Sequence, residues 1–151
     1  MQTLSAKYLN LKIIEDAGLA TPKTLLINAE MNLEAFLSAC PKNSRFIVRS
    51  IQAIEDGEAQ SYAGHFWSSD AIQANKIEET IELATQKNQA ILETLKHSQK
   101  PQLMLQTFVE HKVGGILFTP WSFFSEFFYI EYSNNSVQEA VEGKTNSFDL
   151  L

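Results

Sequence analysis

The sequence predicts an α+β fold with a mostly antiparallel sheet. Helical patterns dominate the first hundred residues, and three strand-like runs follow Pro101. Helices and strands that are segregated along a chain are typical of α+β architecture. The chain has 151 residues, of which 44% are hydrophobic and 20% charged. That length and composition suit one domain or two small lobes with a real core.

The first four elements alternate between helix and strand. Ser5 is a natural cap for an amphipathic helix that ends near Gly18. Residues 21–28 read as a turn followed by a short strand. Asn32 is expected to cap a two-turn helix, and residues 45–50 form an apolar strand that runs into an arginine and a serine.

The later part begins with a long polar loop at residues 50–64 and an extended segment up to Ser69. An amphipathic helix is predicted from Asp70 to His97, with a charged face exposed to solvent. The predicted strands that follow cover residues 102–109, 114–119 and 126–132. The first two are expected to form a hairpin with His111 and Lys112 near its turn. A new apolar pattern begins near the C-terminus.

Charge and cysteine content exclude several classes of protein. The net charge is −6 and no long basic run occurs, so we expect neither a nucleic-acid partner nor an anionic membrane surface. No apolar run is long enough to span a bilayer. The single cysteine, Cys40, permits no intrachain disulfide and favours a reducing, cytoplasmic location. We interpret Cys40 as a small buried hydrophobic residue.

The common catalytic and metal-binding motifs are absent from the sequence. His65, His97 and His111 are widely separated, and neither HExxH nor CxxC spacing occurs. The tripeptide GKT at residues 143–145 lacks the earlier glycine and the strand-to-helix context of a phosphate-binding loop. A metal site within the chain is therefore not predicted.

Arg49 at the end of an apolar strand has two interpretations. It can form a salt bridge with Glu55 or Asp56 that pins the following loop. Alternatively, a rigid strand aims it at phosphate oxygens, with loop N–H groups completing an anion site and Gly64 allowing a close approach of the backbone. Lys7, in the first turn of a helix, does not by itself distinguish the two.

Four blocks in the same order resemble one family. The segment "SAKYLNLKIIEDAG" is similar to GGKAANLGELLRAG, and "VRSIQAIEDGEAQSYAGH" is similar to VRSSATAEDLPDASFAGQ. Downstream, "LMLQTFVEHKVGGILFT" is similar to VVVQRMVPADVSGVLFT, and "YIEY" with "EAVEGK" to IEA followed by GEAVVSG. The matched residues include Lys7, Arg49, Gly64, Gln106 and Val109. Together the blocks resemble the N-terminal ATP-binding domain of phosphoenolpyruvate synthase, pyruvate phosphate dikinase and rifampin phosphotransferase.

The resemblance implies an ATP-grasp-like fold, with residues 1–99 as a first lobe and residues 100–151 as the start of a second. It also implies binding of Mg-ATP, whose β-phosphate passes to a histidine on another domain. Carried over by position, Lys7 and Arg49 would contact phosphates, while Gly64 and Ser68 would lie beside the nucleotide. The segment Gln106, Thr107 and Val109 would read the adenine edge, and Glu131 resembles an acid on the following strand.

Departures from the family pattern keep other functions open. The first Gly-Gly is replaced within Leu4-Ser5-Ala6, and the second serine of VRSS by Ile51. The later half of the family's domain, its phosphohistidine domain and its substrate-binding barrel have no counterpart in these 151 residues. The isolated chain is therefore expected to be inactive as a kinase. The alternatives are a degenerate, non-catalytic binding or regulatory module of the same fold, and a complete small kinase acting as a homodimer.

Overall fold

The computed structural model describes residues 5–56, 62, 64–118, 128–134, 139–140 and 146–150. The predicted features at Ser61, Ala63, Thr119 and residues 143–145 lie outside that part of the chain. The chain divides into two compact units, Met1–Val109 and Glu110–Leu151. The first unit contains helices and an antiparallel sheet, and the second contains another antiparallel sheet. The predicted α+β fold class is therefore confirmed.

The first unit is built on a three-stranded antiparallel sheet. Its strands are β1 (Thr24–Ile27), β2 (Phe46–Ser50) and β3 (Leu103–Thr107), in the order β1-β3-β2. The register pairs Leu25 with Leu105 and Val48 with Leu105 on the two sides of β3. Because β3 is central, its residues from Leu103 to Gln106 are all buried.

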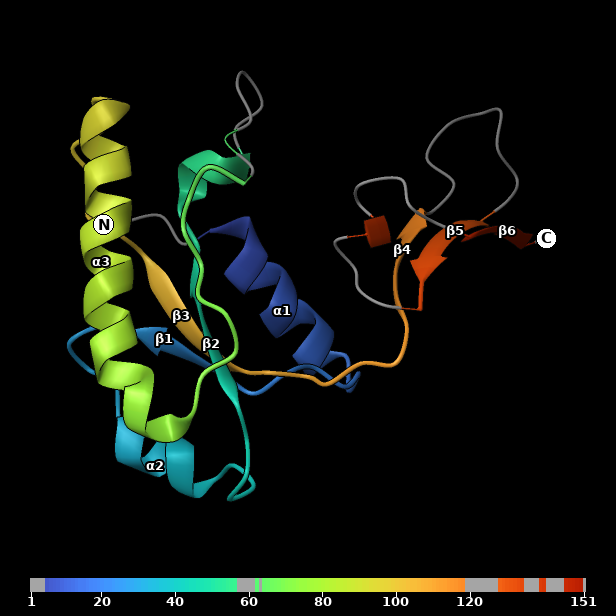
Figure 1. Ribbon diagram of the computed structural model, residues 1–151, viewed down its shortest axis with the longest axis horizontal. Coiled ribbons are helices and arrows are strands. Elements are labelled where there is room, and N and C mark those ends of the chain that lie inside the picture. The colour runs from blue at the N-terminus through green and yellow to red at the C-terminus, as the bar shows by residue number, and fades with distance from the viewer. Residues whose placement is uncertain are drawn as a thin grey trace. The chain divides into compact units, whose positions relative to one another are not determined.

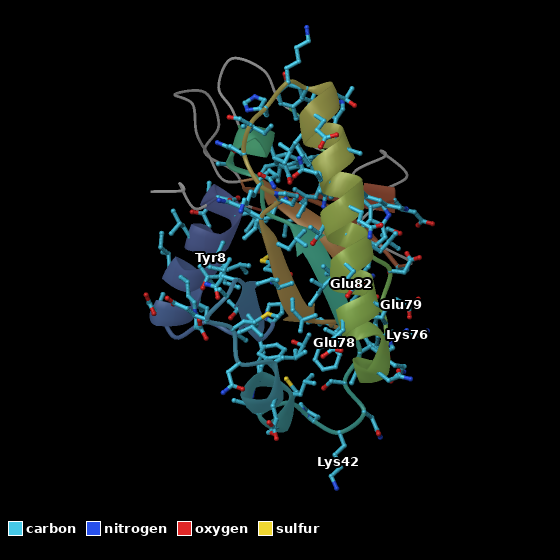
Figure 2. All side chains as sticks on the ribbon, turned by 90° about the vertical axis from the view of Figure 1, so that its left-hand side faces the viewer. Tyr8, Lys42, Lys76, Glu78, Glu79 and Glu82 are labelled. Atoms are coloured by element: carbon cyan, nitrogen blue, oxygen red, sulfur yellow. The ribbon has the colours of Figure 1, made fainter. Side chains whose placement is uncertain are left out.

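Helices lie on both faces of this sheet (Figures 1 and 2). The helices are α1 (Ala6–Asp16), α2 (Leu33–Ser38) and α3 (Ile77–Thr94), and a short 3-10 helix, η1 (Ala53–Asp56), follows β2. The hydrophobic core lies between α3 and one face of the sheet, where Val48, Leu103 and Leu105 meet Ile77 and Ala84. Helix α1 lies on the other face.

The amphipathic helix begins later than the sequence predicts. Residues 70–73 are not helical, because Ile72 exchanges both backbone hydrogen bonds with Phe46 at 2.8 Å and extends the edge of β2. A 3-10 turn at Ala74–Lys76 then leads into α3. The predicted charged face is exposed, and Figure 2 shows Glu78, Glu79 and Glu82 on the outer side of the helix.

Asn88 is a polar residue on the buried face of α3, which also carries Thr80. Its side chain is fully buried, accepts a hydrogen bond from Trp67 N at 2.7 Å and donates one to Trp67 O at 3.1 Å. The carboxamide therefore makes the two hydrogen bonds that a neighbouring strand would otherwise make with the backbone of Trp67. Such pairing of a buried amide avoids the cost of unsatisfied polar groups.

The second unit contains a separate sheet of order β4-β5-β6, with strands Gly114–Phe118, Phe128–Ser133 and Asn146–Leu150. The predicted hairpin between residues 102–109 and 114–119 is wrong, since β4 pairs with β5. Both sides of β3 are already occupied by β1 and β2. For the same reason the first unit continues to Val109, about ten residues beyond the predicted end of the first lobe at residue 99.

None of the helices in the described ranges is both long and apolar enough to cross a bilayer.

Candidate functional site

The candidate site lies at the end of β2, on the sheet face opposite α3. Alternation along β2 buries Val48 and Ser50 towards the core side, and turns Ile47 and Arg49 to the face that carries α1. Arg49 sits directly across from Met104, and Ile47 across from Gln106. Arg49 and Gln106 are therefore diagonal neighbours on one face, within reach of long side chains.

Arg49 is held by a neutral group. Its Nη1 donates to Gln106 Oε1 at 3.3 Å, and the side chain is partly buried. No carboxylate among the described side chains pairs with Arg49, and the predicted salt bridge to Glu55 is not formed. The side chain of Asp56, the other predicted partner, lies outside the described part of the chain. The described part of the site therefore leaves a positive charge uncompensated at the strand end.

Glu55 binds Lys7 in place of Arg49. Lys7 Nζ lies 2.8 Å from Glu55 Oε2 and 3.5 Å from the carbonyl oxygen of Ser50, the residue after Arg49. The other carboxylate oxygen of Glu55 accepts from Ser50 Oγ at 2.6 Å and from Gln52 N at 3.3 Å. Both carboxylate oxygens are thus engaged, and only 7% of the Glu55 side chain is exposed.

The position of Lys7 follows from local sequence. Ser5 caps α1, and its hydroxyl accepts from the backbone N–H of Lys7 at 3.2 Å. The cap places Lys7 in the first turn, at the end of α1 that meets η1. The lysine side chain remains 32% exposed, so it is accessible to solvent although its ammonium group is bonded to Glu55.

Ser68 also reaches the end of β2. Its hydroxyl accepts from Ser50 N at 3.3 Å, and the neighbouring Ser69 exchanges a hydrogen bond with Val48 through its backbone N–H at 2.9 Å. The segment thus runs along the outer edge of β2. Ser68 itself is exposed, whereas Ser69 is buried and accepts from Val48 N through its hydroxyl.

Gly64 is required for its backbone conformation. Its φ is +79°, a value that side-chain-bearing residues rarely adopt, and an added Cβ would meet no atom of the described structure within 4 Å. Within the described residues, the turn conformation accounts for glycine at this position, and no neighbouring atom requires it.

The predicted adenine-reading segment lies at the other end of the sheet. Thr107 is paired with Phe46 at the start of β2 and donates its backbone N–H to Lys23 O at 2.9 Å. At about 3.3 Å per residue, Thr107 lies roughly 10 Å along the strand from the level of Arg49. Val109 is 57% exposed, and its backbone has no hydrogen-bond partner within the described residues.

Glu131 is part of the second unit. It is paired with Ile116 in β4, and its backbone oxygen lies 2.6 Å from the position that a Cβ on Gly115 would take. Only glycine allows this approach of the two strands. The sequence match at Gly115 thus has a structural reason within this sheet.

A separate cavity of about 330 Å³ lies beside the end of α3. It is lined by His65, Ala90, Ile91, Thr94 and Leu95, and mostly by apolar surface. None of the predicted phosphate-contacting residues lines it. No cluster of three or more His, Cys, Asp or Glu side chains suited to a metal ion occurs within the described ranges.

The comparisons with known proteins identify no relative. No family model matches the chain, and no curated protein or solved structure is significantly similar to it. The resemblance in the four sequence blocks therefore stays a prediction.

Proposed function

We propose that this chain is the ATP-binding portion of a phosphotransferase of the phosphoenolpyruvate synthase and pyruvate phosphate dikinase type. The observation that carries the proposal is Arg49, a partly buried cation with a neutral partner and no described counter-ion. Guanidinium groups in such settings suit phosphate oxygens, which accept charge-assisted hydrogen bonds. The order of the four sequence blocks supplies the identity of the anion.

In this proposal Arg49 is the principal phosphate contact, and Lys7 is the second. The ammonium of Lys7 has three donors, of which Glu55 and the Ser50 carbonyl take two. One donor remains for a phosphate oxygen. Ser68 lies beside Ser50 and can contribute its hydroxyl. The role of these groups is positioning and charge neutralisation, which dominate phosphoryl transfer.

The adenine end of the proposed site rests on Val109. The backbone of Gln106 belongs to the central strand, and the N–H groups of Thr107 and Phe108 donate to Lys23 O and Arg45 O. Within the described residues, the backbone of Val109 has no hydrogen-bond partner, and its apolar side chain is exposed. We assign the hydrogen bonds to the adenine edge to the backbone of Val109. Thr107 belongs to the strand that leads to Val109 and makes none of these bonds.

The described residues do not form a magnesium site. The carboxylate nearest to Lys7 is Glu55, and its two oxygens are already bonded to Lys7, Ser50 and Gln52. Mg²⁺ is commonly carried by substrate phosphates with only one or two carboxylates. In our proposal the metal enters with ATP, and the described residues bind the phosphates.

Isothermal titration of Mg-ATP into the wild-type chain and Arg49→Ala tests the proposal. We expect wild-type binding between micromolar and millimolar, and weakening of about tenfold or more in Arg49→Ala, since a hydrogen bond to a charged group contributes roughly 1.5–3 kcal/mol. Lys76→Ala is the matched control, because it removes the same charge from the exposed end of α3. Absence of binding by folded wild-type protein at millimolar Mg-ATP would refute the proposal.

The Lys7–Glu55 ion pair favours a second candidate function, a non-catalytic module. In that module Lys7, which matches a phosphate-contacting lysine of the family, has only a structural role. The two candidates differ in the response to ATP. A degenerate module would keep its thermal stability unchanged in saturating Mg-ATP, whereas a nucleotide-binding lobe would be stabilised by mass action.

A further inference from the structure

We infer that Gln106 is a positioning residue, whose side-chain amide aims the Arg49 guanidinium at an anion while leaving its positive charge intact. The inference rests on the proposed function and concerns how that site is built. Gln106 was expected to act through its backbone at the base, and the structure gives its side chain a different partner.

The amide belongs to a polar chain that crosses all three strands of the first sheet. Thr24 in β1 stands directly opposite Gln106 in β3, and Arg49 in β2 is its diagonal neighbour. Gln106 Nε2 donates to Thr24 Oγ1 at 3.0 Å, and Gln106 Oε1 accepts from Arg49 at 3.3 Å. Only 2% of Gln106 is exposed, so the amide has few conformational alternatives.

The orientation of the amide follows from the same chain. The hydroxyl of Thr24 donates to the carbonyl of Pro22 at 2.9 Å, and therefore offers Gln106 only a lone pair. The amide nitrogen must face this acceptor. The amide oxygen then faces Arg49, which has donors only. A flipped amide would place donor against donor and acceptor against acceptor, so Thr24 fixes the group that holds the guanidinium.

The neutrality of Gln106 is the second part of the inference. The three preceding residues of β3, from Leu103 to Leu105, are apolar and buried, so a polar side chain at the next position requires a partner. A glutamate would supply an acceptor and also cancel the charge of Arg49, as Glu55 does for Lys7. The amide supplies the acceptor without a charge. Gln106 therefore orients the Arg49 guanidinium and leaves its positive charge uncompensated.

This separation of orientation from charge predicts that two substitutions differ in their effect on the order of Arg49, although both weaken anion binding. Gln106→Leu removes the acceptor but keeps the charge of Arg49, whereas Gln106→Glu keeps an acceptor and compensates the charge. The order of Arg49 is measured by the hydrogen-exchange rate and relaxation of its guanidinium Nη–H resonances, because Nη1 donates to Gln106. Anion binding is measured by titration with inorganic tripolyphosphate. Gln89→Leu is the control, since Gln89 is only partly buried and donates to the exposed Glu93 on α3.

We expect Gln106→Leu to increase the exchange rate at the Arg49 Nη–H groups and to weaken tripolyphosphate binding by about tenfold, the loss of one charged hydrogen bond. Gln106→Glu is expected to leave the resonances slowly exchanging and still to weaken binding. A purely structural role would not separate these two readouts. Thr24→Val removes the hydroxyl that orients the amide. It should therefore raise the exchange rate at Arg49 and weaken tripolyphosphate binding, as Gln106→Leu does.

The outcomes distinguish failure of this inference from failure of the proposed function. An unchanged Arg49 resonance in folded Gln106→Leu, or in Thr24→Val if the first variant does not fold, overturns the positioning role. Undiminished binding by Gln106→Glu overturns the requirement for neutrality. If wild-type protein binds neither tripolyphosphate nor Mg-ATP, the proposed function itself fails and the inference falls with it, whatever the resonance shows.

Discussion

Glu55→Gln is predicted to have two opposite effects, on stability and on anion affinity. The substitution keeps the shape of the side chain but removes the charge that pairs with Lys7 at 2.8 Å. Glu55 is 6% exposed and has three donors around it, so one of them meets an amide N–H in the variant. We expect a loss of roughly 2–3 kcal/mol in the free energy of unfolding, the usual cost of disturbing a hydrogen bond to a buried charge.

Anion affinity should rise in the same variant. A phosphate oxygen bound to Lys7 on the side away from Glu55 would lie about 5 Å from the carboxylate, and Coulomb's law gives a repulsion of about 1 kcal/mol at the dielectric constant of water and about 3 kcal/mol at an effective value of 20. Because Lys7 is 32% exposed, the smaller value applies. It corresponds to binding that is about fivefold tighter.

The assay combines thermal unfolding with titration of tripolyphosphate. Glu79→Gln is the matched control, since Glu79 also binds a lysine, Lys76, at 2.8 Å but is 72% exposed. Its substitution should change neither quantity measurably. A Glu55→Gln protein that is folded but binds tripolyphosphate more weakly than wild type would refute the reasoning, because it would mean that Glu55 orients Lys7 for the anion.

Two further predictions concern the segment between β2 and α3. Asn88→Ala should destabilise the protein by roughly 2–4 kcal/mol, because Trp67 loses partners for both backbone groups. Chemical denaturation measures this loss, and Gln86→Ala on the exposed side of α3 should leave the midpoint unchanged. Gly64→Ala should cost about 1 kcal/mol through its φ of +79°, and Gly64→Asn less, as measured by thermal unfolding. Equal stability of the two Gly64 variants would contradict a conformational origin.

Local patterns predicted most elements because the determinants are local. Ser5 caps α1 and Asn32 caps α2 through side-chain hydrogen bonds within three residues of the cap. Apolar spacing located the core face of α3, and alternation located β2. The start of α3 was misplaced because Ile72 is held by Phe46, a strand residue that is distant in sequence.

Strand pairing and side-chain partners could not be predicted in the same way. A strand of apolar residues such as β3 does not specify its neighbours, and here β1 and β2 occupy both of its sides. The sequence selected Lys7 and Arg49 as cations of one site, and in one of two interpretations gave Glu55 or Asp56 as the partner of Arg49. Only the fold shows that Glu55 pairs with Lys7.

The same limit applies to Gln106. A single glutamine in an apolar strand indicates that a polar partner is needed, but not which one. Its contact with Arg49 depends on the register of β2 against β3, and its orientation depends on Thr24 from β1. These residues are separated by 57 and 82 positions in the chain, so no short motif contains them.

The central claim is that the end of β2 binds the phosphates of ATP. The most direct test is a titration of Mg-ATP followed by amide chemical shifts of the isotopically labelled chain. We predict that the largest changes occur at Lys7, Arg49, Ser50 and Ser68, with smaller changes at Val109. Changes confined to the cavity around His65, or no changes at millimolar Mg-ATP, would contradict the account.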